Sequence, residues 1–143
     1  MTVQRILVID DETFVREALQ RVLGSSAVAV MVAPDADTGR ATLRESAVDL
    51  VIIDVVLPGM DGVSLIKEIR REYPDMRIIA ISGGGNFGLS AYRPDAISTN
   101  AYLAACSAAG ADGILAKPFE TAALRSLVGQ VFSVERAARS ALS

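Results

Sequence analysis

Four charged residues have types and positions that could support phosphoryl chemistry. A pair of aspartates, Asp10 and Asp11, follows the apolar run 6–9. Asp54 follows the run 50–53, and Lys117 follows the run 113–116. Two carboxylates about 4 Å apart repel by ~4 kcal/mol at an effective dielectric near 20, so three together favour a bound cation or a retained proton. Mg²⁺ prefers such oxygen ligands, and a lysine beside it would neutralise a phosphoryl group. The residue types therefore predict a divalent-cation and phosphoryl site.

The order of secondary structure explains how distant residues could reach one site. Apolar periodicity predicts strands and helices in alternation. The predicted strands are 5–9, 27–32, 49–53, 77–81 and 113–116, and the predicted helices are 12–23, 34–45, 63–73, 121–132 and one ending near Gly110. This alternation predicts a parallel sheet with helices on both faces. Since parallel strands bring their carboxyl ends to one edge, the charged residues should meet there.

Two local predictions accompany this pattern. In the first helix, six apolar residues are expected to form one stripe facing the sheet. They are Phe14, Val15, Ala18, Leu19, Val22 and Leu23. The segment 58–62 is rich in turn-forming residues and is predicted to be a loop.

Composition excludes several classes of function. The chain has 143 residues, 51% of them hydrophobic, and a net charge of -3, which fits one globular domain without a basic surface for nucleic acid. It contains no histidine, so imidazole-based triads and most zinc sites are excluded. Cys106 is the single cysteine and is expected to be a buried apolar residue. No apolar run is long enough to cross a membrane and no secretion signal is visible, so we expect a cytoplasmic protein.

Each charged motif also has a plainer interpretation when taken alone. Asp10 and Asp11 could cap a helix, Asp54 could be a turn residue, and the Lys117-Pro118 pair could begin a loop. The site hypothesis fails only if all of these plainer interpretations hold at once, at the carboxyl ends of three separate strands.

The combined motifs resemble the bacterial response-regulator receiver domain. The matching segments are 8–11, 53–54, 57–62, 81–83, 110–112 and 117–119, and the resemblance extends from about Val3 to Phe132. It implies a flavodoxin-like, doubly wound α/β fold whose five-stranded parallel sheet has the order 2-1-3-4-5. A receiver domain is expected at 1–133, with an extended loop at 83–98, and a tail or helix end at 134–143.

The resemblance also implies a role for each acidic residue. Asp54 would be the phosphoacceptor and would form an aspartyl phosphate. Asp11 and Asp54 would bind Mg²⁺ directly, Asp10 would bind it through water, and the main-chain carbonyl of Val56 would be a further ligand.

The same resemblance assigns the phosphoryl-binding groups. Lys117 would pair first with Asp54 and then with the phosphoryl group, which Ser82 and Gly83 would also contact. The Ser82 hydroxyl would signal the change, and the peptide bond before Pro118 would be cis.

The chain departs from the family pattern at two places. The family usually carries an aromatic residue three positions before the lysine, where this chain has Ile114, so we expect only a partial switch at Ser82 and Ile114. The segment 83–112 is longer than one helix with two short connections requires. Its glycine-rich part, 83–88, fits the pattern G-x-G-x-x-G, but no helix opens directly behind it, so a dinucleotide site is disfavoured.

The resulting functional hypothesis is a receiver that accepts a phosphoryl group from a phosphohistidine on Asp54. Its expected partners are a sensor histidine kinase or a histidine phosphotransfer protein and an unknown downstream protein that docks on it, with no direct binding of DNA or membrane. We expect no enzymatic activity other than the slow hydrolysis of its own phosphoryl group. The alternatives are a degenerate receiver fold that only binds protein, and a small Mg²⁺-dependent phosphatase.

Overall fold

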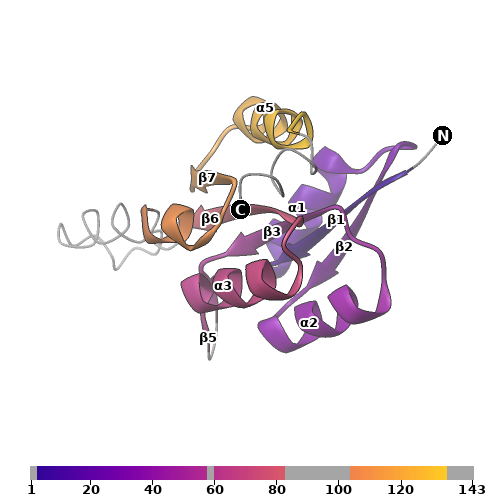
Figure 1. Cartoon of the computed structure of the whole chain (residues 1–143). Helices are drawn as coiled ribbons and strands as arrows, with labels where there is room; N and C mark the ends of the chain where they lie inside the picture. Colours follow the sequence, from indigo (N-terminus) through magenta and orange to yellow (C-terminus); the bar gives the residue numbers. More distant parts are fainter. Residues whose placement is uncertain (1–2, 58–59, 83–103, 135–143) are drawn as a thin grey trace.

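A five-stranded parallel sheet forms the centre of the molecule (Figure 1). The computed structural model describes residues 3–57, 60–82 and 104–134. The strands of the sheet are β1 (Gln4–Ile9), β2 (Val28–Ala33), β3 (Leu50–Asp54), β6 (Arg77–Ser82) and β7 (Gly113–Ala116). Their order in the sheet is β2-β1-β3-β6-β7. This is the predicted order 2-1-3-4-5, because β6 and β7 are the fourth and fifth strands of this sheet and the short strands β4 and β5 lie outside it. The fold prediction is therefore confirmed.

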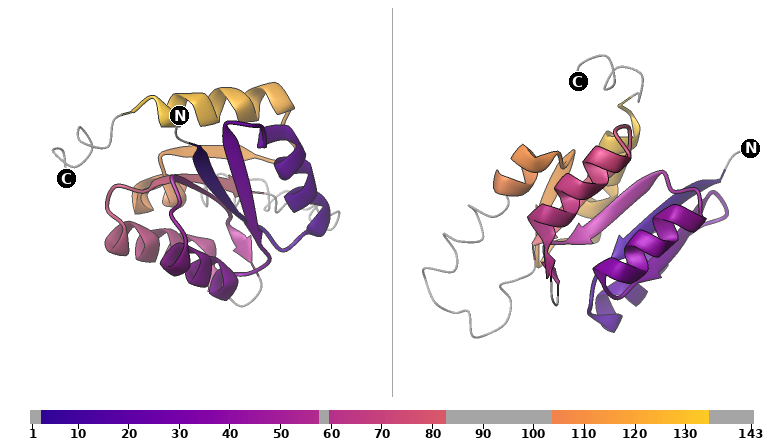
Figure 2. Two further views of the ribbon diagram at one scale, coloured as in Figure 1. Left: turned by 90° about the vertical axis from the view of Figure 1, so that its right-hand side faces the viewer. Right: turned by 60° about the horizontal axis from the view of Figure 1, so that its bottom comes forward.

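Helices cover both faces of this sheet (Figure 2). They are α1 (Thr13–Leu23), α2 (Ala36–Glu45), α3 (Gly62–Glu72) and α5 (Thr121–Phe132), and residues 104–109 are also helical. One buried cluster packs the sheet against α1 and α5, and the other packs it against α2, α3 and the helical segment 104–109. The doubly wound arrangement follows from strands that are apolar on both faces.

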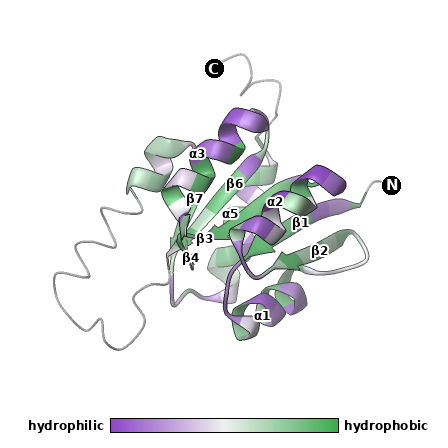
Figure 3. Ribbon diagram, turned by 90° about the horizontal axis from the view of Figure 1, so that it is seen from below, coloured by the Kyte–Doolittle hydropathy of each residue, from purple (hydrophilic) through white to green (hydrophobic). Residues whose placement is uncertain are grey.

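The hydrophobic pattern explains which surfaces are buried. β3 is buried at every position, as a central parallel strand should be. In Figure 3 the central strands are hydrophobic, whereas α1 and α2 carry hydrophilic stretches. Each of these two helices therefore presents one side to the sheet and one side to solvent.

The strand register brings the predicted site residues to one edge. Ile9 is paired with Ile53, so the aspartates that follow them in sequence, Asp10 and Asp54, lie on adjacent strands. At the other side of the sheet, Ser82 at the end of β6 is paired with Ala116, directly before Lys117. Every one of these strands points in the same direction, so their carboxyl ends form one edge.

The prediction that Phe14 belongs to the buried stripe of the first helix is wrong. Phe14 is 77% exposed, whereas Leu19 and Leu23 are buried. Leu19 lies five positions after Phe14, which places the two residues about 140° apart around an α-helix. Phe14 instead lines the side of an apolar pocket of ≈ 470 Å³ between α1 and the start of α5, which Phe119 and Leu124 also line.

Part of the segment predicted as a loop at 58–62 is a β-strand. β4 (Val56–Leu57) and β5 (Met60–Asp61) form a two-stranded antiparallel sheet next to the end of β3. Two-residue strands are too short to give an alternating sequence pattern, which explains why the sequence did not predict them. Asp61 caps α3 by accepting a hydrogen bond from the Val63 main-chain N–H.

Three predictions fall on parts that the structure does not describe. Gly83 and the extended loop at 83–98 lie outside the described residues, as does the tail from 135 onward. Within the described residues, no helix is both long enough and apolar enough to cross a membrane.

Candidate functional site

Asp10, Asp54 and Lys117 meet at the carboxyl edge of the sheet. Asp10 follows β1 and is 1% exposed, and Asp54 ends β3 and is 5% exposed. The Lys117 Nζ atom, which follows β7, donates to Asp10 Oδ2 at 3.1 Å and to Asp54 Oδ2 at 3.4 Å. Three separate strands thus contribute two buried carboxylates and one ammonium to a single pocket.

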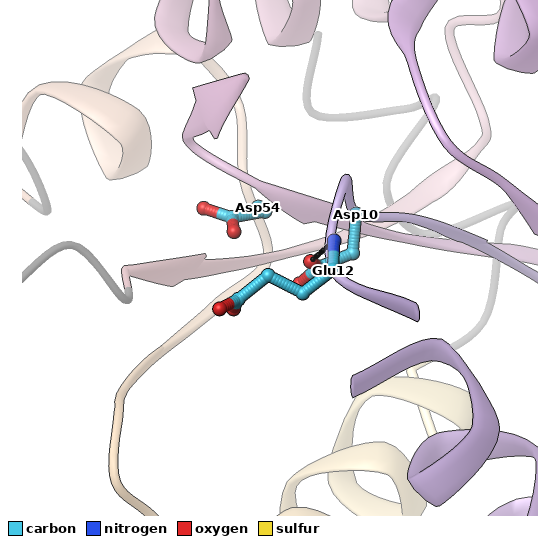
Figure 4. Close-up of side chains that lie close together, drawn as sticks. All are labelled: Asp10, Glu12 and Asp54. Atoms are coloured by element: carbon cyan, nitrogen blue, oxygen red, sulfur yellow. Dashed lines mark hydrogen bonds between the residues drawn. The ribbon is translucent and has the colours of Figure 1, made fainter. Parts of the chain in front are cut away.

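Glu12 is a third carboxylate in this pocket, and the sequence analysis did not identify it. Its Oε1 atom accepts a hydrogen bond from Lys117 Nζ at 3.2 Å. Figure 4 shows Glu12 and Asp10 side by side, with Asp54 opposite them on another strand. In the described part of the chain, Asp10, Glu12 and Asp54 each offer an oxygen within 4.8 Å of the others, as metal ligands would.

Asp11, predicted to be a metal ligand, does not join this cluster. Its side chain is exposed, whereas Asp10 on one side of it and Glu12 on the other both reach Lys117. Asp11 lies at a bend that the hydrogen bond from the Glu12 N–H to Asp10 Oδ1 closes, and the side chains on either side of this bend reach the same lysine. The signal that could have identified Glu12 was therefore its two-residue spacing from Asp10.

The two buried aspartates are oriented by the same kind of hydrogen bond to the main chain. Asp10 Oδ1 accepts the Glu12 main-chain N–H at 2.9 Å, and Asp54 Oδ1 accepts the Val56 main-chain N–H at 2.9 Å. Aspartate favours this bond to the backbone two residues on, because its short side chain reaches that N–H. One oxygen of each carboxylate is thus held by the backbone, while the other faces Lys117.

Burial makes Asp54 an unusually weak acid. The pKa of Asp54 is raised from 3.8 to about 6; desolvation by burial is the largest cause, and the charge of Asp10 acts in the same direction. The Val56 N–H and the Lys117 ammonium act in the opposite direction and lower this pKa. The carboxylate is therefore ionised at neutral pH but retains protons in mild acid.

The carboxylates keep Lys117 protonated. Burial alone would lower the pKa of Lys117, but the charges of Asp54 and Asp10 and the hydrogen bonds to Asp10 and Glu12 together raise it. The side chains of Lys117, Asp10 and Asp54 are 12%, 2% and 5% exposed, so the interactions among these three are weakly screened by solvent. Lys117 therefore remains a fixed positive charge in the pocket.

The donor atoms of this pocket fit a hard divalent cation. Three carboxylates offer oxygen atoms within 4.8 Å of one another, and only one ammonium opposes their charge. Mg²⁺ binds through one or two carboxylates and retains several waters, which suits a pocket whose Glu12 side is open to solvent. The raised pKa of Asp54 indicates the same excess of negative charge and burial that a cation would relieve.

The remaining predicted residues lie on β4, β6 and β7 and at the peptide bond after Lys117. Val56 begins β4 two residues after Asp54, the last residue of β3, and is 48% exposed. Ile114 lies on β7 and is 39% exposed. The peptide bond between Lys117 and Pro118 is cis. Ser82 is placed only through its main chain, at the last position of β6.

Comparison with protein families gives a match over most of the chain. Residues 6–129 match the family described as "Response regulator receiver domain". Among solved structures, the receiver domain of NtrX from Brucella abortus has a TM-score of 0.76 and 29% sequence identity, and the match covers 91% of this chain and 99% of that one.

Curated relatives place the same kind of segment in longer proteins. The transcriptional regulatory protein CseB of Streptomyces coelicolor is 35% identical over 119 residues, which is 83% of this chain but 45% of CseB. The sensor kinase CckA of Brucella abortus is 32% identical over 128 residues, which is 88% of this chain and 12% of CckA. The chain thus spans less than half the length of either relative.

Proposed function

Because the chain belongs to the response regulator receiver family, we propose that it accepts a phosphoryl group on Asp54 from a phosphohistidine donor. The observation that carries this proposal is the contact of Lys117 Nζ with Asp54 Oδ2 at 3.4 Å, beside the second buried carboxylate, Asp10. A receiver that had lost this chemistry would have no need for an ammonium and two carboxylates in one buried pocket, since burying charges is costly.

The transfer requires little covalent assistance from the protein. An oxygen of Asp54 forms the new O–P bond, the P–N bond of the donor breaks, and the imidazole nitrogen leaves with the bonding pair and takes a proton. Lys117 neutralises charge on the transferred group, and the bond from Val56 N–H holds the other oxygen of Asp54 in place. Mg²⁺, held by Asp54 and Asp10 together with Asp11, would supply further neutralisation of the phosphoryl oxygens.

The direct test is phosphorylation by a small donor. The protein is incubated with acetyl phosphate, with and without Mg²⁺, and its intact mass is measured. We expect one added phosphoryl group that depends on Mg²⁺, is stable in acid and labile in base, and is absent from the Asp54→Asn variant.

Two other outcomes would each replace the proposal with a named alternative. If the folded protein gains no phosphoryl group under any of these conditions, a receiver fold used only for protein binding becomes the better explanation. If many equivalents of acetyl phosphate are hydrolysed, the protein is a phosphatase rather than a phosphoacceptor.

The proposed partners follow from the same chemistry. A sensor histidine kinase or a histidine phosphotransfer protein would supply the phosphoryl group, and a downstream protein would read the phosphorylated state by docking. The expectation that this chain does not bind DNA directly stays a prediction, because CseB is named a transcriptional regulatory protein and is about twice as long as the matched segment.

A further inference from the structure

Glu12 occupies a helix-capping position without capping the helix. It is the residue directly before α1, yet its side chain makes no capping hydrogen bond. Serine, threonine, aspartate and asparagine are favoured at this position because their short side chains reach the first free N–H groups. The Glu12 side chain instead turns to Lys117, and the Oε1–Nζ distance is 3.2 Å.

The backbone around Glu12 is held firmly enough to fix the reach of this side chain. The Glu12 N–H donates to Asp10 Oδ1 at 2.9 Å. The Arg16 guanidinium donates to the Asp10 main-chain carbonyl at 2.9 Å and to Thr13 Oγ1 at 3.1 Å, which ties the turn before α1 to the helix. A side chain that starts from a fixed point can reach Lys117 only if it has the right length.

The contacts of Lys117 indicate which carboxylates determine its position. An ammonium has three N–H donors, and here it faces three carboxylates. The distances from Nζ are 3.1 Å to Asp10, 3.2 Å to Glu12 and 3.4 Å to Asp54, so the contact with the proposed phosphoacceptor is the longest. Asp10 and Glu12 together therefore hold the ammonium to one side of Asp54.

We propose that Glu12 is a positioning residue that holds the Lys117 ammonium where it can neutralise the phosphoryl group arriving at Asp54. This inference rests on the proposed phosphorylation of Asp54. It also specifies how Glu12 acts. The Glu12 side chain is 47% exposed, so its charge is screened by solvent, and what it contributes is a hydrogen-bond acceptor at the correct reach.

Two conservative variants separate reach from charge. Glu12→Gln keeps the length and an acceptor oxygen but removes the charge, whereas Glu12→Asp keeps the charge but shortens the side chain by one methylene. If reach matters, phosphorylation by acetyl phosphate at saturating Mg²⁺ should stay within about twofold of the wild type in Glu12→Gln. It should fall by roughly two- to fivefold in Glu12→Asp and in Glu12→Ala.

A spectroscopic measurement tests the position of Lys117 without any phosphorylation. The chain has only two lysines, Lys67 and Lys117, so ¹⁵N labelling of lysine side chains gives two ammonium signals. Hydrogen exchange of the Lys117 ammonium in metal-free protein should be several-fold faster in Glu12→Asp and Glu12→Ala than in the wild type or Glu12→Gln. The exposed Lys67 on α3 is the internal control.

Glu17→Gln is the matched control, because it removes the same charge from an exposed position on α1, the helix that Glu12 directly precedes. Circular dichroism and urea unfolding would establish that each variant is folded. The inference is overturned if Glu12→Asp behaves like the wild type while Glu12→Gln is impaired, or if every Glu12 variant matches Glu17→Gln. It would also be overturned by unchanged exchange of Lys117 in Glu12→Ala. Failure of the wild type itself to accept a phosphoryl group would instead reject the proposed function.

Discussion

At the scale of single residues, Asp54 makes the stability of the protein depend on pH. Its folded pKa is about 6 and its ordinary value is 3.8, with burial as the main cause. Between these two pH values the folded state binds more protons than the unfolded state, so stability falls as pH rises. The penalty is absent below the unfolded pKa and fully present above about pH 6. At ~1.4 kcal/mol per pKa unit, it reaches at most about 3 kcal/mol.

Replacing Asp54 by asparagine should remove this penalty. Asparagine retains an oxygen for the Val56 N–H but carries no charge. In metal-free buffer, the free energy of unfolding of Asp54→Asn should exceed that of the wild type by about 1–3 kcal/mol at pH 7.5, and the gain should shrink towards pH 4. Urea unfolding across this range measures it. A difference that is independent of pH, like that expected for the exposed Glu17→Gln, would contradict the assigned pKa of Asp54.

Removing the ammonium should have the opposite effect. Lys117→Met would leave Asp10 and Asp54 buried without their cation, which typically costs about 3–5 kcal/mol for a buried pair. The loss should be largest above pH 6 and should diminish in acid, where Asp54 can be protonated, and added Mg²⁺ should restore part of it. Thermal unfolding at several pH values and Mg²⁺ concentrations measures these effects.

Lys67→Met is the control for this comparison, because it removes the only other lysine from an exposed position on α3. It should change stability by no more than about 0.5 kcal/mol. An equal effect of the two substitutions would show that Lys117 does not balance the charge of the pocket.

The sequence predicted the meeting of Asp10, Asp54 and Lys117 because strand direction alone determines it. It did not predict the inclusion of Glu12, because that depends on the direction of one side chain at the start of a helix. The wrong prediction for Phe14 has a similar origin, since residues at the margin of an apolar stripe can face either the core or a groove.

At the scale of elements, the start of α3 is fitted tightly against the end of β3. The main-chain N–H of Gly62 donates to the Val55 carbonyl at 3.1 Å. A Cβ atom at Gly62 would collide with the Cα atom and carbonyl group of Val55. Because Val55 directly follows Asp54, this close approach of helix and strand also constrains the backbone next to the proposed phosphoacceptor.

Alanine substitutions at two helical glycines should therefore change the free energy of unfolding in opposite directions. Gly62→Ala should lower the free energy of unfolding by about 1–3 kcal/mol, because the obstructing atoms belong to the backbone and cannot rotate away. Gly129→Ala should raise it by about 0.5–1 kcal/mol, because Gly129 lies in α5 with no atom within 4 Å of a new Cβ. Urea unfolding of both variants tests the pair, and a stabilised Gly62→Ala would show that the start of α3 can move freely.

Sequence periodicity located the long elements and failed on the short ones. The strand Gly113–Ala116 and the helix Thr121–Phe132 have the predicted bounds, and the other ends either agree with the prediction or differ from it by one or two residues. The start of α2 at Ala36 is set by Asp35, whose side chain accepts the Thr38 N–H at 2.7 Å, whereas the predicted helix began at residue 34. Local capping geometry, which periodicity does not contain, determines such ends.

At the scale of the whole molecule, the question is how a phosphoryl group on Asp54 would alter a distant surface. Ser82 ends β6 beside Ala116 of β7, and Ile114 lies two residues earlier on β7 with 39% of its surface exposed. A new charge-assisted hydrogen bond is worth about 1.5–3 kcal/mol. Since ~5.5 kcal/mol is needed to move an equilibrium from 1:99 to 99:1, this bond alone would raise a 1% state to roughly 10–60%.

The conformational change that follows phosphorylation should be partial, because Ile114 stands where the family usually carries an aromatic ring that could amplify this change. With Mg²⁺ and beryllofluoride as a phosphoryl mimic, NMR relaxation dispersion should detect two exchanging states at Gly113–Ala116 of β7. In Ile114→Tyr, the ring can adopt an inward position that a Ser82 contact favours, so the exchange should diminish and the signals should move further towards the activated state. Ile114→Leu keeps an apolar side chain without a ring and should match the wild type. A fully shifted wild-type spectrum without exchange would show instead that other groups provide the missing free energy.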